Sequence, residues 1–147
     1  MKKRTIIILS SILLIILIGG AIGIYLYKKP VKDFADSKAE ITLNAKAIFD
    51  EFVKDQNAAI AKYVSNDKTI QISGLISDVQ IGNDGTVTII LDVANPDGDV
   101  SCTLTPEESQ KAKDLKPGTN INIKGQCTGF QELINKEVVM IRCGLVK

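Results

Sequence analysis

Histidine and tryptophan are absent from this chain of 147 residues, and only 5% of its residues are aromatic. Without histidine, the Ser-His-Asp and Cys-His catalytic groups, zinc sites with histidine ligands and the usual proton shuttle near neutral pH are excluded. Phosphate-binding loops and the dinucleotide motif Gly-x-Gly-x-x-Gly are also missing. We therefore interpret the chain as a protein that is not an enzyme and that uses no cofactor and no metal.

Cysteine is scarce, with Cys102, Cys127 and Cys143 too far apart for a Cys-x-x-Cys zinc or redox site. The strand pattern described below turns all three inward, where cysteine behaves as a small apolar residue. In the expected topology Cys102 and Cys143 lie on neighbouring parallel strands, so a disulfide between them is one prediction. The alternative is three buried thiols, because a bridge between adjacent strands is often strained.

Basic and aromatic residues are few where a nucleic-acid site would need them. Residues 64–147 carry 8 basic and 11 acidic side chains, and Phe130 is the only aromatic residue after Tyr63. A protein that binds single-stranded nucleic acid needs a basic groove and aromatic rings on which bases stack. The composition therefore argues against nucleic acid as a partner.

A long apolar run is the plainest feature that is present. Thr5–Tyr27 contains 23 residues without a charge, between Lys2-Lys3-Arg4 and Lys28-Lys29. A helix of this length rises about 34 Å, which is enough to cross a hydrocarbon core of about 30 Å. We expect residues 1–29 to be an uncleaved membrane anchor that forms a single span.

Two questions about this segment stay open. Small residues at Ala21-Ile22-Gly23 would suit a signal peptidase, but the chain stays apolar through residues 24–27, which favours the anchor. No cysteine precedes Cys102, which excludes a lipid-modified cysteine at the cleavage site. Basic residues flank both ends of the run, so the positive-inside rule decides little, and the free amino terminus favours a domain outside the cytoplasm.

Two glycines within the run bear on association. Gly19 and Gly23 form a Gly-x-x-x-Gly pair, which would let two helices approach closely and dimerise. The alternative is that they are simply small residues near the outer interface.

In the remainder of the chain the spacing of apolar residues changes twice. Residues 30–43 form a polar stretch that we interpret as a tether. In residues 44–63 apolar residues recur at steps of three and four, which predicts an amphipathic helix capped by Asn44. We expect Phe49, Phe52 and Tyr63 to pack on the barrel that follows.

From Lys68 apolar and polar residues alternate, which predicts strands near residues 70–76, 86–91, 100–104, 121–127 and 139–145. In the last of these strands, the face expected to point inward carries Val139, Ile141, Cys143 and Leu145. Thr105-Pro106 begins a short helix between the third and fourth strands. This order is typical of the OB-fold, a five-stranded Greek-key barrel. The predicted fold class is mainly β: an OB-fold barrel over residues 64–147, preceded by the amphipathic helix and an N-terminal transmembrane helix. Gly74 and Gly125, each in mid-strand, are expected opposite one another.

Acidic residues gather at one turn. Asp92, Asn95, Asp97 and Asp99 invite comparison with a calcium site. However, the glycine is misplaced for an EF-hand loop, and no bidentate glutamate follows at the required offset. A polar turn is favoured. Glu107-Glu108 is explained by the positive end of a helix dipole.

Several segments together resemble the tRNA_anti-like family of bacterial OB-fold proteins. They are the alanine-rich run 58–63, the strand 70–76, and the three strand segments 100–102, 123–127 and 141–143 that carry the cysteines. The resemblance covers roughly residues 44–146. It implies an OB-fold in a small exported, membrane-anchored or lipoprotein module, and the family name implies likeness to anticodon-binding OB-folds. It supplies no catalytic residues.

The ligand face of an OB-fold lies on its second and third strands. Its outward positions here form the predicted ligand face: Thr86, Thr88, Ile90, Ser101 and Thr103. We expect a membrane-anchored, non-enzymatic binding module of the cell envelope, with its domain on the periplasmic side of a bacterial inner membrane. The partner would be a protein, a glycan or a small ligand. The alternative, supported by fold analogy alone, is a nucleic-acid-binding OB-fold protein held at the membrane.

Overall fold

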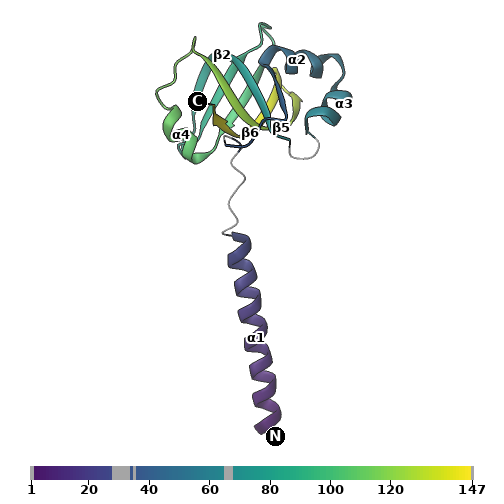
Figure 1. Cartoon of the computed structure of the whole chain (residues 1–147), viewed down its shortest axis with the longest axis vertical. Coiled ribbons are helices and arrows are strands. Elements are labelled where there is room, and N and C mark those ends of the chain that lie inside the picture. Colours follow the sequence, from purple (N-terminus) through teal and green to yellow (C-terminus); the bar gives the residue numbers. More distant parts are fainter. Residues whose placement is uncertain (1, 28–33, 35, 65–67, 147) are drawn as a thin grey trace. The chain divides into compact units, whose positions relative to one another are not determined.

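The chain divides into two compact units, Met1–Lys32 and Asp33–Lys147 (Figure 1). The computed structural model describes residues 2–27, 34, 36–64 and 68–146. The first unit is a single helix, α1 (Lys2–Tyr27). Its segment Ser10–Tyr27 has a mean hydropathy of 2.1 and none of it is buried, so by length and composition it could cross a membrane.

The second unit is mainly β and is built on a six-stranded sheet. Its strands are β1 (Ile41–Asn44), β2 (Ile70–Ile81), β3 (Val87–Asp92), β4 (Gly98–Leu104), β5 (Asn120–Glu132) and β6 (Lys136–Leu145). The strand order is β1-β2-β3-β4-β6-β5, and β2 also pairs with β5. Strands β2 to β6 therefore close into a ring, in which β4 and β6 are parallel and the other pairs are antiparallel.

All five strands expected from the alternating pattern occur, but the predicted tether is wrong in part. Residues 41–44 form β1, which pairs in parallel with the start of β2. Phe34, in the same predicted tether, is only 1% exposed. The apolar residues at 41 and 43 are too few to be recognised as an alternating strand without their partner.

The helix predicted over residues 44–63 is interrupted. It consists of α2 (Ala45–Lys54), α3 (Gln56–Ala59) and a π-helical turn, η1 (Ile60–Val64). The Asn44 side chain caps α2, as predicted, by accepting a hydrogen bond from the Ala47 N–H at 2.7 Å. Asp55 is extended, and its carboxylate accepts the Ala58 N–H at 3.0 Å. This bond offers the backbone an alternative to the helical pattern, so α2 ends there.

Aromatic rings join these helices to the sheet. Phe49, Phe52 and Tyr63 are each no more than 1% exposed. The Phe52 ring stacks on Phe130 of β5, with centroids 5.5 Å apart and planes at 12°, while Phe49 meets the same Phe130 ring edge-on at 6.1 Å. The Phe49 ring also occupies the space that a Cβ on Gly98 would need, so this close approach requires glycine.

The short helix α4 (Pro106–Ala112) holds two strands through buried polar groups. Glu108 is 6% exposed, and its carboxylate accepts the Leu145 N–H of β6 at 3.1 Å. Ser109 Oγ accepts the Val87 N–H of β3 at 3.0 Å. The helix dipole is therefore only part of the explanation for Glu108, because its side chain also accepts a hydrogen bond from β6.

The three cysteines are buried free thiols in the structure. Cys102 and Cys127 lie on either side of Met140 in neighbouring strands, and Cys143 pairs with Leu104. Burial raises the pKa of Cys127 to about 11, so this thiol stays protonated near neutral pH. The Cys102–Cys143 disulfide is not formed in the structure and stays a prediction.

The expectation that Gly74 and Gly125 lie opposite one another is wrong. In the β2–β5 register Gly74 pairs with Ile121, and Gly125 pairs with Ile70. The spacing of the two glycines within their strands carried no information on the register between them.

Candidate ligand-binding groove

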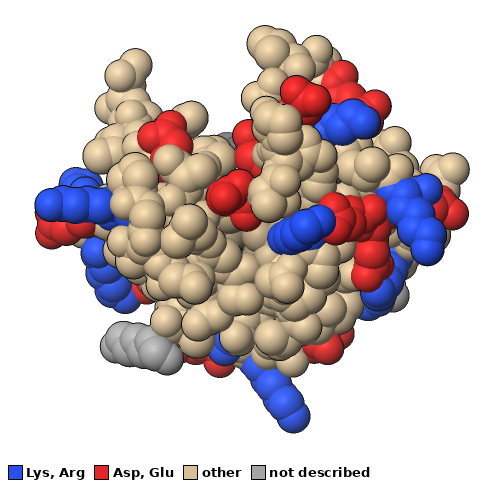
Figure 2. Space-filling view, turned by 90° about the horizontal axis from the view of Figure 1, so that it is seen from above, with Lys and Arg blue, Asp and Glu red and all other residues tan. Residues whose placement is uncertain are grey.

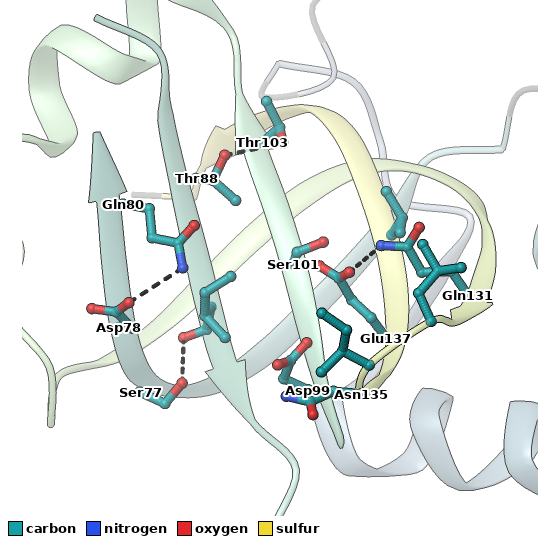
Figure 3. Close-up of a pocket in the computed structure, with 14 residues that line it drawn as sticks. Ser77, Asp78, Gln80, Thr88, Asp99, Ser101, Thr103, Gln131, Asn135 and Glu137 are labelled. Carbon is teal, nitrogen blue, oxygen red and sulfur yellow. Dashed lines mark hydrogen bonds between the residues drawn. The ribbon is translucent and has the colours of Figure 1, made fainter. Parts of the chain in front are cut away.

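Acidic side chains border a hollow between two projections on the face of the second unit that Figure 2 shows. A groove of about 790 Å³ lies on the outer surface of the ring, across β2, β3, β4 and β6 and beside the hairpin that joins β5 to β6 (Figure 3). Its floor is made by the outward side chains of these strands, since the alternate side chains fill the barrel interior.

Strand register arranges the outward side chains of the groove in three rows, most of them polar. From β2 toward β5, the rows are Gln80, Thr88 and Thr103; Asp78, Ile90, Ser101 and Val139; and Asp99, Glu137 and Gln131. The hydroxyls of Thr88 and Thr103 share a hydrogen bond of 3.2 Å. Ser101 is only 5% exposed and lies on the floor. The rows offer hydroxyl, amide and carboxylate groups over the width of four strands.

Three carboxylates, Asp78, Asp99 and Glu137, line the groove, and none of its described lining residues is Lys, Arg or aromatic. Asp78 accepts the Val79 N–H at 2.9 Å, and Glu137 accepts a hydrogen bond from the Gln131 amide. Two of the three carboxylates are thus partly satisfied by the protein itself.

Asp99 differs from the other two. Its Oδ1 atom is buried and has no hydrogen-bond partner among the described residues. Burial, and to a smaller extent the neighbouring Glu137 carboxylate, raise the pKa of Asp99 above its usual value. A desolvated carboxylate oxygen that lacks a donor is energetically unfavourable. The groove therefore favours a ligand that supplies a donor or a positive charge at this point.

The β5–β6 hairpin adds an apolar edge to the groove. Leu133 is 86% exposed and Ile134 is 99% exposed, and both line the groove. Single exposed apolar residues are ordinary, but two adjacent ones beside a polar cleft offer a contact surface. The groove thus combines an acidic floor with an apolar rim.

The predicted ligand face lies almost wholly in this groove. Thr88, Ile90, Ser101 and Thr103 line it, whereas Thr86 lies in the turn before β3 and is not among its lining residues. That these residues bind a ligand stays a prediction.

The sequence pattern alone does not point to the three groove carboxylates, to Gln131 or to the Leu133-Ile134 hairpin, all of which line the groove. The sequence groups Asp99 with the acidic turn instead. Asp99 precedes the buried Val100, so the alternation marks it as an outward residue. For Glu137 the alternation is misleading: the inward face expected for the last strand contains Val139 and Ile141, whereas the structure buries Val138 and Met140 and turns Glu137 and Val139 toward the groove.

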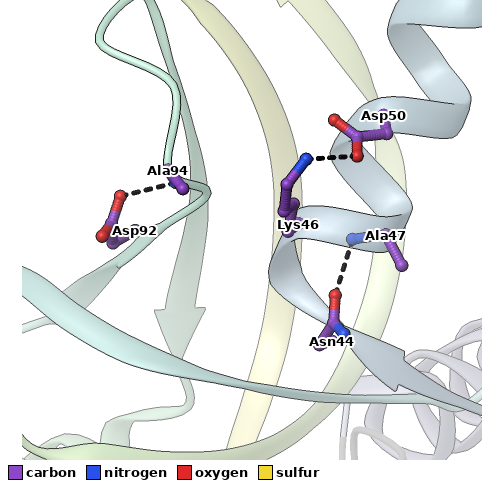
Figure 4. A network of polar contacts seen from close by, with 6 residues as sticks. All are labelled: Asn44, Lys46, Ala47, Asp50, Asp92 and Ala94. Carbon is purple, nitrogen blue, oxygen red and sulfur yellow. Dashed lines mark hydrogen bonds and ion pairs between the residues drawn. The ribbon is translucent and has the colours of Figure 1, made fainter.

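In the structure, side chains of the acidic turn accept hydrogen bonds from its own backbone. Figure 4 shows Asp92 accepting the Ala94 N–H at 2.8 Å. Asn95 accepts the Asp97 N–H at 3.0 Å in the same way. Within the described part of the chain, no group of three or more His, Cys, Asp or Glu side chains is placed to hold a metal ion.

Comparisons with known proteins agree with this architecture. The tRNA_anti-like family model matches residues 1–145. A search of the curated proteins finds no match. The chain is similar to a solved structure from Klebsiella pneumoniae subsp. pneumoniae MGH 78578, named a "putative nucleic acid-binding lipoprotein", at 20% identity and a TM-score of 0.55, over 80% of this chain and 100% of that chain. This likeness supports the fold.

Two further solved structures are less similar. The Stn1-Ten1 complex of S. pombe matches at 17% identity and a TM-score of 0.38, over 54% of this chain and 58% of that chain. The aspartyl-tRNA synthetase of Entamoeba histolytica matches at 15% identity and a TM-score of 0.41, over 60% of this chain and 20% of that chain.

Proposed function

Since the chain belongs to the tRNA_anti-like family and carries an OB-fold domain, we propose that it is a non-enzymatic binding module, held at a membrane by α1, whose groove receives its ligand. The observation that carries this proposal is the groove itself, which lies on the OB-fold face that commonly binds ligands. Within it, the unpartnered Asp99 oxygen marks a point where a bound group would be stabilised.

The membrane part of the proposal rests on Ser10–Tyr27, which is apolar, unburied and long enough to span. Basic residues flank both ends of the apolar run and decide little, so the free amino terminus is what favours a short end inside and the OB-fold domain outside, in the cell envelope. The name of the Klebsiella neighbour includes the word lipoprotein, which is compatible with a membrane location for this domain too.

Topology is tested with a reporter fused after Lys147. An enzyme that works only outside the cytoplasm is expected to be active there, and one that works only in the cytoplasm is expected to be inactive. The reverse result would overturn the orientation. Mass spectrometry of the membrane-extracted protein tests cleavage, since the anchor requires an intact amino terminus.

Nucleic acid is the alternative ligand, and the name of the Klebsiella neighbour includes nucleic-acid binding. Against it, the described groove lining holds three carboxylates and neither a basic nor an aromatic side chain. Carboxylates repel phosphates, and bases would find no ring on which to stack.

We expect single-stranded DNA and RNA not to be retained by the purified full chain in detergent at about 0.15 M salt. The matched control is a single-strand-binding protein assayed in the same detergent. Clear retention that weakens as salt rises would replace our proposal with the nucleic-acid alternative.

A further inference from the structure

We infer that the groove receives an extended, positively charged segment of a protein partner, with a Lys or Arg side chain placed between Asp99 and Glu137. This inference rests on the proposed function, because it names the kind of partner that the same groove takes. It is carried by the pairing of two carboxylates in adjacent strands, by the width of the groove and by its apolar rim.

The charge argument begins with strand register. Asp99 and Glu137 are directly paired in the parallel strands β4 and β6, so two like charges face the groove side by side. The Gln131 amide donates to Glu137, whereas the buried Oδ1 of Asp99 has no partner among the described residues. Like charges in this arrangement are destabilising, and a cation placed between them would offset both. An ammonium or guanidinium group also supplies the donor that Oδ1 lacks.

The width of the groove favours a chain over a single ion. Its lining residues come from β2, β3, β4 and β6, which are successive neighbours in the sheet. Strands about 4.8 Å apart make this crossing roughly 14 Å, and an extended chain advances about 3.4 Å per residue. A segment of four or five residues is therefore needed to cross the floor. Along that path Asp78 lies at one side, and Asp99 with Glu137 at the other.

The apolar rim favours a peptide that carries apolar side chains over a purely polar polycation. Leu133 and Ile134 are almost fully exposed at the groove edge, where apolar side chains of a bound segment would cover them. A basic residue flanked by apolar residues matches both the floor and the rim. Anionic lipid head groups and nucleic acid would meet like charge at the same place.

The test selects ligands from a displayed library of random seven-residue peptides. The full chain in nanodiscs of zwitterionic lipid is the target, and empty nanodiscs remove peptides that bind lipid. We expect the selected peptides to be enriched in Lys or Arg next to apolar residues. The most enriched peptide, synthesised with a fluorophore, should bind at least tenfold more tightly than the same peptide with Glu at its basic positions.

Variants then locate the binding. Asp99→Asn combined with Glu137→Gln should weaken the selected peptide at least tenfold. Asp114→Asn, which removes a carboxylate from an exposed residue outside the groove lining, should change its affinity less than twofold. Leu133→Ser with Ile134→Ser should weaken the peptide several-fold while leaving any binding of spermine unchanged. Because residues 133 and 134 are exposed, this last pair tests the rim without disturbing the core.

Several results would overturn the inference. The first is that the library yields acidic or neutral peptides, or none. The second is that the selected peptide binds the Asp99/Glu137 double variant as tightly as it binds the Asp114 control. The third is that spermine binds as tightly as the best peptide. Photo-crosslinking of the selected peptide separates the two proposals. An acidic or neutral peptide crosslinked within the groove refutes only this inference, whereas crosslinks confined to other surfaces also refute the groove as the ligand site.

Discussion

The inner and outer faces of β3 and β4 come from one alternating sequence pattern, but they differ in burial and in how far their polar groups are paired. Inward residues such as Ile89, Leu91 and Cys102 are fully buried in a closed core. Outward residues of the same strands form the groove, where the Asp99 carboxylate keeps an oxygen without a described partner. The inner face is satisfied by the protein, whereas in our proposal the outer face is completed by a bound ligand. A shift of register by one residue would exchange the two faces.

The largest expected effect comes from the aromatic contact that joins α2 to the inner face. Phe52→Ala removes a ring that is 1% exposed and stacked on Phe130. Truncating a buried ring typically costs about 3–5 kcal/mol when a cavity remains. We expect a loss of this size in denaturant unfolding of the full chain in detergent, with protection from hydrogen exchange lost together in α2 and in the sheet. Val53→Ala, at a neighbouring side chain that is 46% exposed, should cost less than about 1 kcal/mol. Sheet protection unaffected by the Phe52 change would mean that α2 is only a spacer.

Gly125→Val tests how tightly the inner face is closed. A Cβ at this position would lie 2.5 Å from Cys143 Sγ and 3.1 Å from the Ile141 carbonyl oxygen. Overpacking of this kind costs about 1–3 kcal/mol, measured as a lower unfolding midpoint. In a background of Cys143→Ala the same change should cost less, because the sulfur has gone. Equal losses in the two backgrounds would show that the sulfur is not the obstacle.

Asp99→Asn tests the outer face and has the opposite sign. Because burial raises the pKa of Asp99, its ionised form is disfavoured in the folded state. The ionised Asp99 carboxylate therefore destabilises the folded state. This destabilisation is complete above the raised pKa of the folded state and disappears as pH falls below the ordinary value of 3.8. We expect the variant to unfold at an equal or slightly higher denaturant concentration at pH 7, by less than about 1 kcal/mol after allowance for solvent screening. The gain should vanish near pH 3. A clear loss at pH 7 would show that the carboxylate has a structural role.

The smallest expected effect lies away from both faces, on the helices. Lys62 and Glu51 form an exposed ion pair at 2.8 Å, which lowers the pKa of Glu51 and raises the pKa of Lys62 to about 12. Glu51→Gln should cost less than about 1 kcal/mol. The loss should be present above pH 4.5 and should disappear as pH falls through the lowered pKa of Glu51. A double-mutant cycle with Lys62→Met measures the pair, and a coupling that survives 1 M salt would contradict an exposed pair.

The sequence predicts the inner face better than the outer one. Alternation identifies five strands, and in the strands that became β2, β3 and β4 it also identifies the buried residues, because the inward positions there are apolar. In β6 it fails: Val139 and Ile141 are expected inward, but Val138 and Met140 are buried instead, because this strand is apolar on both faces. It cannot identify the pairing of Asp99 with Glu137, since that pairing depends on a parallel register between segments 38 residues apart. The break at Asp55 was missed for a local reason, a carboxylate that caps the next helix. Strand β1 was missed because four residues show too little period until β2 lies beside them.

Strand β1 also has a mechanical consequence. It is the first regular element after the segment that follows α1, so tension transmitted along the chain from a membrane would reach β1 before the closed ring. Its partners in β2 run in parallel from Ile41 to Asn44, and a pull directed along the strand loads these residues together in shear. When they yield, four residues lengthen the linker by at most about 14 Å, while the ring of β2 to β6 keeps all its pairings. Such an extension would cost the apolar contacts that Ile41 and Leu43 of β1 make with the core.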